Sequence, residues 1–297
     1  MENNQNDKVA LIRCHLSLIV VIIFWGSSFA SIKILLPQIP ANTIAFLRFF
    51  LASIVLGIFL VITKQPRLQR KHLPSILLTG LSGIAIFNVL QNQGLRYAGA
   101  TDSAILIAMS PVFIALLSWL ILKERISKLQ IIGIFIAFAG SVLVATDGSL
   151  SDLGFHRMRL LGDLLVLLSS IIWAVFSISL KKLLKHYPPT TIITYSTFVG
   201  TVFLIPFSLL EYPVDLTAVT ATGWLNIIYL ALLASALGNL IWNAALNTVS
   251  AVTAGAYLYL SPVVAAIVAL IFLNEIPSIY TIIGGLIILM GTYFASK

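Results

Sequence analysis

Two groups of amide side chains lie inside apolar stretches of the sequence, where polar groups are costly. Asn88, Gln91 and Asn92 belong to one stretch, and Asn239 and Asn243 belong to another. Residues four apart share one face of a helix, so each group forms a polar stripe. Amides inside a bilayer either line a solute pathway or bond neighbouring helices. We therefore expect the two stripes to face a shared central cavity, with interhelical bonding as the alternative.

Aromatic residues accompany the two polar stripes. Trp25 and Trp173 lie near the middles of their apolar stretches, Trp242 lies within the second stripe, and Tyr257 and Tyr259 follow it. Tryptophan is usually enriched at the membrane interfaces rather than in the middle of a span. We expect these rings to line the same amphipathic cavity, and core packing is the alternative.

Prolines and charged residues complete the set of candidates. Pro111 and Pro262 fall within predicted helices, where proline removes a backbone donor and bends the helix, so they are expected to be hinges or static kinks. Arg48 is a charge inside a predicted helix, and it attracts a substrate carboxylate, snorkels to the interface or pairs with a helix-end carbonyl. Glu124 and Glu275 occupy corresponding helix ends, where structural or gating roles are expected.

The motif content argues against enzymes and nucleotide-driven pumps. No HExxH, DxxxD, GxSxG or GxxxxGK[ST] pattern occurs, and the histidines lie at or beyond the ends of the apolar stretches. The net charge of +8 comes from short loops rather than from a basic face with interleaved aromatics. We therefore predict no enzyme activity, no metal, no cofactor and no nucleic-acid partner.

The elements that position these residues must be membrane-spanning helices. Apolar residues make up 59% of the 297 residues and charged residues 9%, whereas soluble proteins are roughly one-quarter charged. The apolar runs approach the ~20 residues that cross a bilayer, and lipid leaves helices as the way to satisfy the backbone. The predicted helices are 14–36, 41–63, 73–94, 100–122, 128–146, 161–184, 190–210, 222–245, 250–273 and 278–295.

The distribution of basic residues predicts the orientation. With the N-terminus in the cytoplasm, 13 Lys and Arg residues fall in cytoplasmic segments and 4 on the other side. The positive-inside rule then favours an even number of spans with both termini cytoplasmic.

The two halves of the sequence match each other. At an offset of 148 residues Trp25 falls on Trp173, and at an offset of 151 Asn88 falls on Asn239. The larger offset also pairs Ser110-Pro111 with Ser261-Pro262, Glu124 with Glu275, Gly133 with Gly284 and Gly140 with Gly291. The predicted units are residues 14–146 and 161–297, joined by a loop at 147–160. Since each holds five helices, the second must be inverted, which is typical of secondary transporters.

These residues resemble the drug/metabolite transporter superfamily, in particular its ten-helix EamA branch. The resemblance covers both halves of the chain and depends on Phe24-Trp25-Gly26-Ser27-Ser28-Phe29 with Lys33, on Phe46-Leu47-Arg48-Phe49, and on Leu122-Lys123-Glu124-Arg125 followed by Gly133. The second half departs from the pattern at Ala174 and Ser196. The resemblance implies a carrier of the cytoplasmic (inner) membrane, usually an exporter of amino acids or related metabolites.

Together these observations predict an all-α integral membrane protein that carries a small molecule by alternating access. Mostly neutral and aromatic cavity candidates favour zwitterionic or amphipathic solutes such as amino acids. A sugar derivative, a nucleotide-linked compound or a drug is the alternative solute, and a channel is the alternative mechanism. The expected partners are a small-molecule substrate and the lipid bilayer, and no feature of the sequence specifies an oligomeric state.

Overall fold

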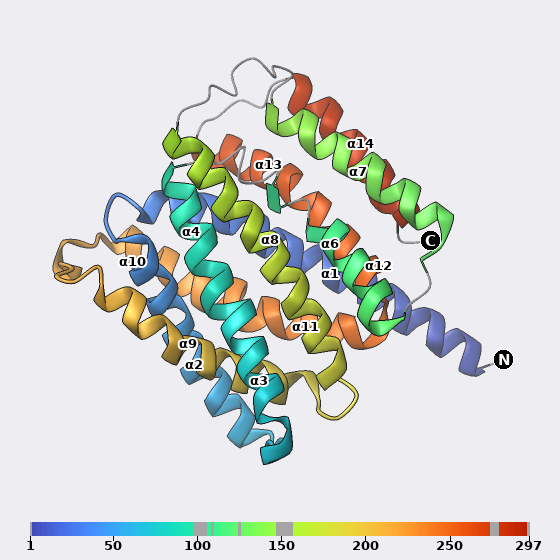
Figure 1. Cartoon of the computed structure of the whole chain (residues 1–297), viewed down its shortest axis with the longest axis horizontal. Helices are drawn as coiled ribbons and strands as arrows, with labels where there is room; N and C mark the ends of the chain where they lie inside the picture. The colour runs from blue at the N-terminus through green and yellow to red at the C-terminus, as the bar shows by residue number, and fades with distance from the viewer. Residues whose placement is uncertain are drawn as a thin grey trace.

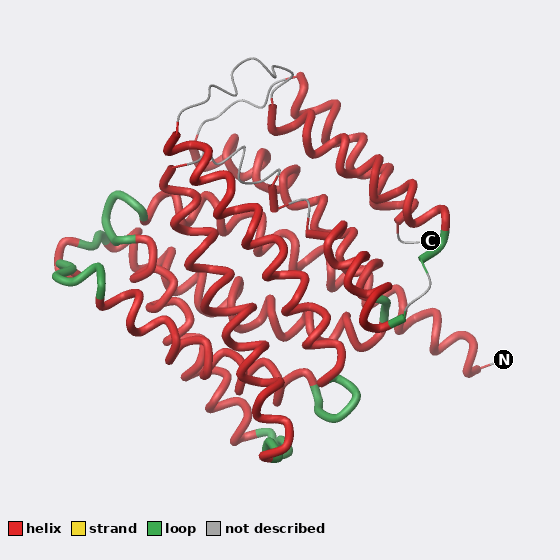
Figure 2. Tube along the Cα trace, viewed as in Figure 1, coloured by secondary structure: helices red, strands yellow, loops and turns green. Residues whose placement is uncertain are grey.

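The computed structural model describes residues 2–97, 106–107, 110–123, 126–146, 157–273 and 279–295. Within these ranges the chain consists of helices and loops without a strand (Figure 2). The all-α prediction is therefore confirmed for this part of the chain. Glu124 and Glu275 lie outside the described residues.

The helices are named in chain order in Figure 1. The α-helices are α1 (Glu2–Leu35), α2 (Ala41–Ile62), α3 (Leu73–Thr79), α4 (Phe87–Tyr97), α6 (Ser110–Leu117), α7 (Lys128–Thr146), α8 (Arg157–Leu183), α9 (Pro189–Leu209), α10 (Ala221–Tyr229), α11 (Gly238–Thr248), α12 (Ala251–Ala256), α13 (Ser261–Leu273) and α14 (Ile279–Ala295). Three segments are π-helical, namely η2 (Gly80–Ile86), η3 (Ser118–Leu122) and η5 (Leu230–Leu237). Three more are 3-10 helices, namely η1 (Arg70–His72), η4 (Leu216–Ala218) and η6 (Tyr257–Leu260).

Most of these helices fit a membrane-spanning role. Seven helical stretches of the described chain are long and apolar enough to cross a bilayer, and three shorter helices are apolar as well. Large apolar side chains such as Ile132, Phe198 and Phe272 are exposed on the outside of the bundle. The outer surface therefore suits lipid, and the chain is a multi-pass membrane protein.

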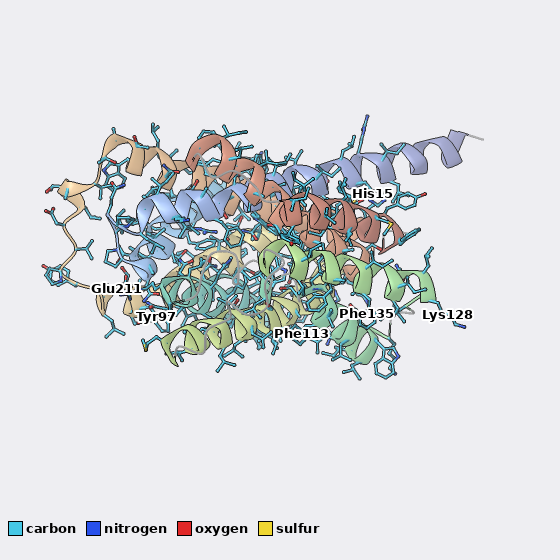
Figure 3. All side chains as sticks on the ribbon, turned by 90° about the horizontal axis from the view of Figure 1, so that it is seen from above. His15, Tyr97, Phe113, Lys128, Phe135 and Glu211 are labelled. Carbon is cyan, nitrogen blue, oxygen red and sulfur yellow. The ribbon has the colours of Figure 1, made fainter. Side chains whose placement is uncertain are left out.

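The bundle has two ends, which Figures 1 and 3 distinguish. Helix α1 begins and α14 ends at the same end of the bundle (Figure 1). Lys128 lies at that end, whereas Tyr97 and Glu211 lie at the other (Figure 3). We call these the Lys128 end and the Glu211 end.

Helices α2 and α9 pack as an antiparallel pair whose two ends are fastened differently. At one end, the Glu211 carboxylate accepts the backbone N–H of Asn42 at 3.1 Å and that of Thr43 at 2.8 Å, as well as the Thr43 hydroxyl at 2.9 Å. At the other end, the hydroxyl of Thr191 lies 3.4 Å from the carbonyl of Pro66. An anion at a helix N-terminus satisfies free N–H groups, so Glu211 caps α2.

The observed helices agree with the predicted bounds to within a few residues, with two differences. The first helix, predicted from residue 14, begins at Glu2 because polar helix-forming residues continue it beyond the apolar run. The second difference is geometry other than α-helical inside three predicted helices. The π-helices η2 and η5 interrupt 73–94 and 222–245, and the 3-10 helix η6 interrupts 250–273. The predicted helix 100–122 lies partly outside the described residues, and α6 and η3 are described parts of it.

Candidate functional site

A cavity lies inside the bundle, between its middle and the Glu211 end. It encloses about 670 Å³ of space, open solvent included. The lining residues come from α1, α2, η2, α4, α8, α11, η6 and α13, and both halves of the chain contribute. They are Trp25, Ser28, Phe29, Ile32, Arg48, Phe49, Gly83, Phe87, Asn88, Gln91, Ile107, Trp173, Asn239, Leu258 and Ser261.

A cluster of aromatic rings lies on the Lys128 side of the cavity. The ring centroids of Trp25 and Trp173 are 5.2 Å apart at an angle of 89°, an edge-on contact. Trp242 is fully buried beside both, at 5.2 Å from Trp25 and 5.9 Å from Trp173. Phe87 adds a further ring 4.9 Å from Trp173. Such ring pairs are stabilising and present an apolar surface, which here forms the cavity floor.

Beyond this floor the described chain is closely packed. Leu180, Leu183, Leu246 and Val249 belong to one buried apolar cluster with the tryptophans. The Lys181 ammonium donates to the carbonyl of Val249 at 2.8 Å, which ties the C-terminal ends of α8 and α11 together. Within the described residues, this packing closes the cavity toward the Lys128 end.

The π-helical segments η2 and η5 precede the amides of the cavity. In a π-helix the backbone N–H bonds the fifth residue back, so carbonyls of the normal ladder are freed for other donors. Asn88 Nδ2 donates to the carbonyl of Ile84 at 2.8 Å, just after η2, and Asn239 Nδ2 donates to that of Ser235 at 2.7 Å, just after η5. Each amide keeps its oxygen and its second N–H available for other partners.

The segment η5 also accepts a hydrogen bond from the first half of the chain. The indole Nε1 of Trp25 donates to the carbonyl of Ala234 at 2.9 Å. Its counterpart Trp173 is more deeply buried than Trp25, but its Nε1 has no partner within the described chain. The two halves are thus similar in sequence here and different in bonding.

Arg48 lines the cavity and does not extend to the membrane interface. Its side chain is 7% exposed, its Nε donates to the hydroxyl of Ser235 at 2.9 Å, and its guanidinium lies 4.6 Å from the ring centroid of Phe49. A snorkelling arginine would place its guanidinium in water at the interface, whereas the guanidinium of Arg48 lies in the cavity wall.

Several predicted site residues are buried near the cavity but do not line it. Asn92 donates its Nδ2 to the carbonyl of Ala41 at 3.0 Å and so bonds α4 to the start of α2. Asn243 is fully buried, and neither its Nδ2 nor its Oδ1 has a partner in the described part of the chain. Trp242 Nε1 is likewise without a partner there. A buried polar group without a hydrogen bond is costly, so these groups are unusual in a membrane interior.

The two tyrosines occupy separate places. The Tyr257 hydroxyl and His15 Nδ1 are 2.7 Å apart, and the two rings stack. Tyr259 is fully buried in another apolar cluster, with Ala137 and Ile288. Neither residue lines the cavity, because the 3-10 helix η6 directs Leu258 there instead.

Pro262 lies at a change of helix geometry. It is the second residue of α13 and follows directly after the 3-10 helix η6. Pro111 belongs to α6, and the residues directly before Ser110 lie outside the described part of the chain. Ser261, which precedes Pro262, lines the cavity.

Several lining residues were not predicted from the sequence, although the spacing of some of them along a helix would have identified them. Ser28, Phe29 and Ile32 lie three, four and seven positions after Trp25, which places them on one helix face. The contribution of Gly83 had no such signal, since it depends on the geometry of η2. Among the described residues, no group of three or more His, Cys, Asp or Glu side chains is placed to hold a metal.

Comparisons with known proteins match both halves of the chain. The family model described as the EamA-like transporter family matches residues 12–146 and again residues 160–297. An uncharacterized transporter of Archaeoglobus fulgidus is 34% identical over 96% of this chain and 97% of its own. A probable terminal-alkyne amino-acid exporter of Streptantibioticus cattleyicolor is 30% identical over 95% of this chain and 92% of its own. A solved crystal structure superposes with a TM-score of 0.79 at 18% identity, over 96% of both chains, which shows a shared fold.

Proposed function

The chain belongs to the EamA-like transporter family of the drug/metabolite transporter superfamily, and from this premise we propose that it is a secondary transporter that exports small amphipathic metabolites. The chain is a transporter and not an enzyme. We propose amino acids and related zwitterionic compounds as its solutes, and alternating access as its mechanism.

One observation carries this proposal, namely a cavity of mixed amide and aromatic lining that is closed toward one end of the bundle. A mainly apolar lining with a few polar groups is typical of small-molecule sites. Tryptophan rings offer an apolar surface, while the oxygens of Asn88 and Asn239 can accept hydrogen bonds from a solute ammonium or hydroxyl. A site that is closed on one side is what a carrier requires, whereas a channel needs a continuous path.

We propose that the three shorter apolar helices also cross the membrane and that the halves are inverted copies of five helices. Three repeated features support this. The π-helices η2 and η5 lie at matching positions, Asn88 and Asn239 make the same bond, and a Ser-Pro pair lies in both α6 and α13. Two similar halves of opposite orientation can exchange shapes and move the opening of a central site from one side to the other. Pro111 and Pro262 are proposed hinges of that exchange.

We propose that the Lys128 end faces the cytoplasm and that the protein resides in the cytoplasmic membrane. Helix α1 begins and α14 ends at this end (Figure 1). Since α2 begins at the Glu211 end, the loop that follows it, with Arg67, Arg70 and Lys71, also lies at the Lys128 end, as the positive-inside rule requires. The cavity of this structure would then lie on the outer side of its aromatic floor.

The experiment is counterflow with purified protein in liposomes loaded with single amino acids. We expect saturable exchange that falls about tenfold or more when Trp173 is replaced by alanine, because the floor of the site is lost. Replacing the lipid-facing Phe198 by alanine is the matched control and should leave the flux unchanged. Ohmic current without saturation would indicate a channel, and absence of flux for every amino acid and related zwitterion would reject the proposed solute class.

A further inference from the structure

We propose that Arg48 and Ser235 form an anion subsite in the wall of the cavity, where the guanidinium binds the carboxylate of the solute while its apolar part lies on Trp25 and Trp173. This inference rests on the proposed function, and it assigns the group that selects the solute. The subsite joins the two halves of the chain, since Arg48 is in α2 and Ser235 is in η5.

The guanidinium is held in a fixed orientation. Its Nε donates to the Ser235 hydroxyl at 2.9 Å, and its plane packs 4.6 Å from the centroid of Phe49. Ser235 is itself fixed, because its carbonyl accepts the amide of Asn239, which also lines the cavity. The Arg48 side chain is 7% exposed. With these two contacts it is held in the cavity wall and does not extend to the membrane surface.

The orientation leaves the right donors for a carboxylate. A guanidinium has five N–H groups, and the bond to Ser235 uses the one on Nε. The four on Nη1 and Nη2 include a parallel pair that matches the two oxygens of a carboxylate. Arg48 lines the cavity, so a solute carboxylate can approach it from there.

The charges around the cavity favour an anion over a cation. Among the described lining residues Arg48 is charged and none is acidic. Only two carboxylate side chains are described elsewhere, and both are occupied, since Glu211 caps α2 and Asp215 bonds Thr217. A cation in a membrane interior is expensive unless an anion or a polar cavity compensates it. A solute carboxylate supplies that compensation, and a solute with only an amine would be repelled.

The subsite is suited to one negative charge. A phosphate carries close to two charges at neutral pH and is normally held by several basic groups or by a helix N-terminus. The lining supplies one guanidinium, flanked by neutral amides and indole rings. We therefore infer a monocarboxylate with an apolar or aromatic body.

The test is binding by purified protein of a panel of matched compounds, namely the amino acids, their C-terminal amides and their decarboxylated amines. Thermal stabilisation reports binding, and counterflow in liposomes reports transport. The variants are Arg48→Gln, Arg48→Lys and Ser235→Ala. Arg96→Gln is the matched control, since Arg96 is an exposed arginine of α4 that bonds Gln93 and does not line the cavity.

We expect at least one acid to stabilise the wild-type protein while its amide and amine do not. In Arg48→Gln the apparent affinity for that acid should fall about 10- to 100-fold, as expected for loss of a charge-assisted bond. Arg48→Lys should restore part of it, and Ser235→Ala should raise KM several-fold with little change in maximal rate. Arg96→Gln should behave as the wild type.

Three results would overturn the inference. They are stabilisation by amides or amines as strong as that by acids, unchanged affinity in Arg48→Gln, or no stabilisation by any acid. The proposed function is judged separately, by saturable flux and its dependence on Trp173. Saturable flux of an amine or amide that needs Trp173 but not Arg48 would keep a metabolite carrier while removing the anion subsite.

Discussion

Asn88 and Asn239 are 151 residues apart and make the same hydrogen bond. Each donates its Nδ2 to the carbonyl four residues earlier, at 2.8 and 2.7 Å, at the point where a π-helical segment returns to α-helix. Both also line the cavity. The bond therefore links an irregularity of the backbone to the orientation of a cavity amide, in both halves of the chain.

Replacing either Asn88 or Asn239 by alanine should reduce transport about tenfold without preventing membrane insertion. The substitution removes a polar group from the cavity and leaves a buried carbonyl without its donor, which costs roughly 1–3 kcal/mol. Initial flux in liposomes is the measurement. Asn226→Ala is the control, because Asn226 makes the same bond to Thr222 at 2.8 Å outside the cavity. Equal losses in all three variants would contradict a role in the site.

Trp25→Phe should destabilise the protein more than Trp173→Phe. Both changes keep an aromatic ring, but the first deprives the Ala234 carbonyl of its donor, whereas the indole N–H of Trp173 has no partner within the described chain. The difference should be about 1–2 kcal/mol. It can be measured from the unfolding midpoints of the two variants in one detergent. A larger loss in Trp173→Phe would show that its N–H is bonded after all.

Gly83→Ala should lower stability, because an added methyl group would collide with the ring of Phe176. Overpacking of this kind costs about 1–3 kcal/mol. Gly57→Ala is the control, since nothing lies within 4 Å of a methyl group at that position. The double variant Gly83→Ala with Phe176→Leu should lose less stability than the sum of the two single changes. If the two losses of stability simply added, the effect of Gly83→Ala would not come from its contact with Phe176.

Asn243→Leu should raise the unfolding midpoint yet lower transport, whereas Asn92→Leu should lower both. The Asn243 amide is buried without a partner in the described chain, so an apolar side chain removes a cost, while Asn92 would lose its bond to the carbonyl of Ala41. Flux should fall in Asn92→Leu because the contact between α4 and α2 is lost. It should fall in Asn243→Leu because we expect a second conformation of the transport cycle to give the Asn243 amide a partner. Wild-type flux in Asn243→Leu would exclude that requirement.

The fold was largely predictable from the sequence because membrane spans are governed by a strong, simple constraint. Runs of apolar residues near the length of a bilayer must be helical, and α2 and α9 follow from that alone. The π-helical segments were not predictable in this way. They depend on close helix contacts, such as that of Gly83 with Phe176, which involve residues far apart in sequence.

The site was predictable in part. Residue type identified Trp25, Asn88 and Arg48, because mid-span polar and aromatic residues are rare enough to stand out. It did not separate Asn88 from Asn92, one helical turn further on, because both lie on the same face. The bond of Asn92 to Ala41 depends on how α4 approaches the start of α2, which a pattern within one helix does not contain.

The Glu211 cap restricts which parts of the bundle are free to shift. One carboxylate from the end of α9 holds two backbone N–H groups and a hydroxyl at the start of α2, and Gln93 of α4 lies 3.5 Å from the same carboxylate. Since breaking such a cap exposes several donors at once, we expect α2 and α9 to move together as a rigid pair. Opening of the cavity at the Glu211 end would then require movement of the other helices. Cross-linking α2 to α9 near residues 42 and 211 should therefore leave turnover intact.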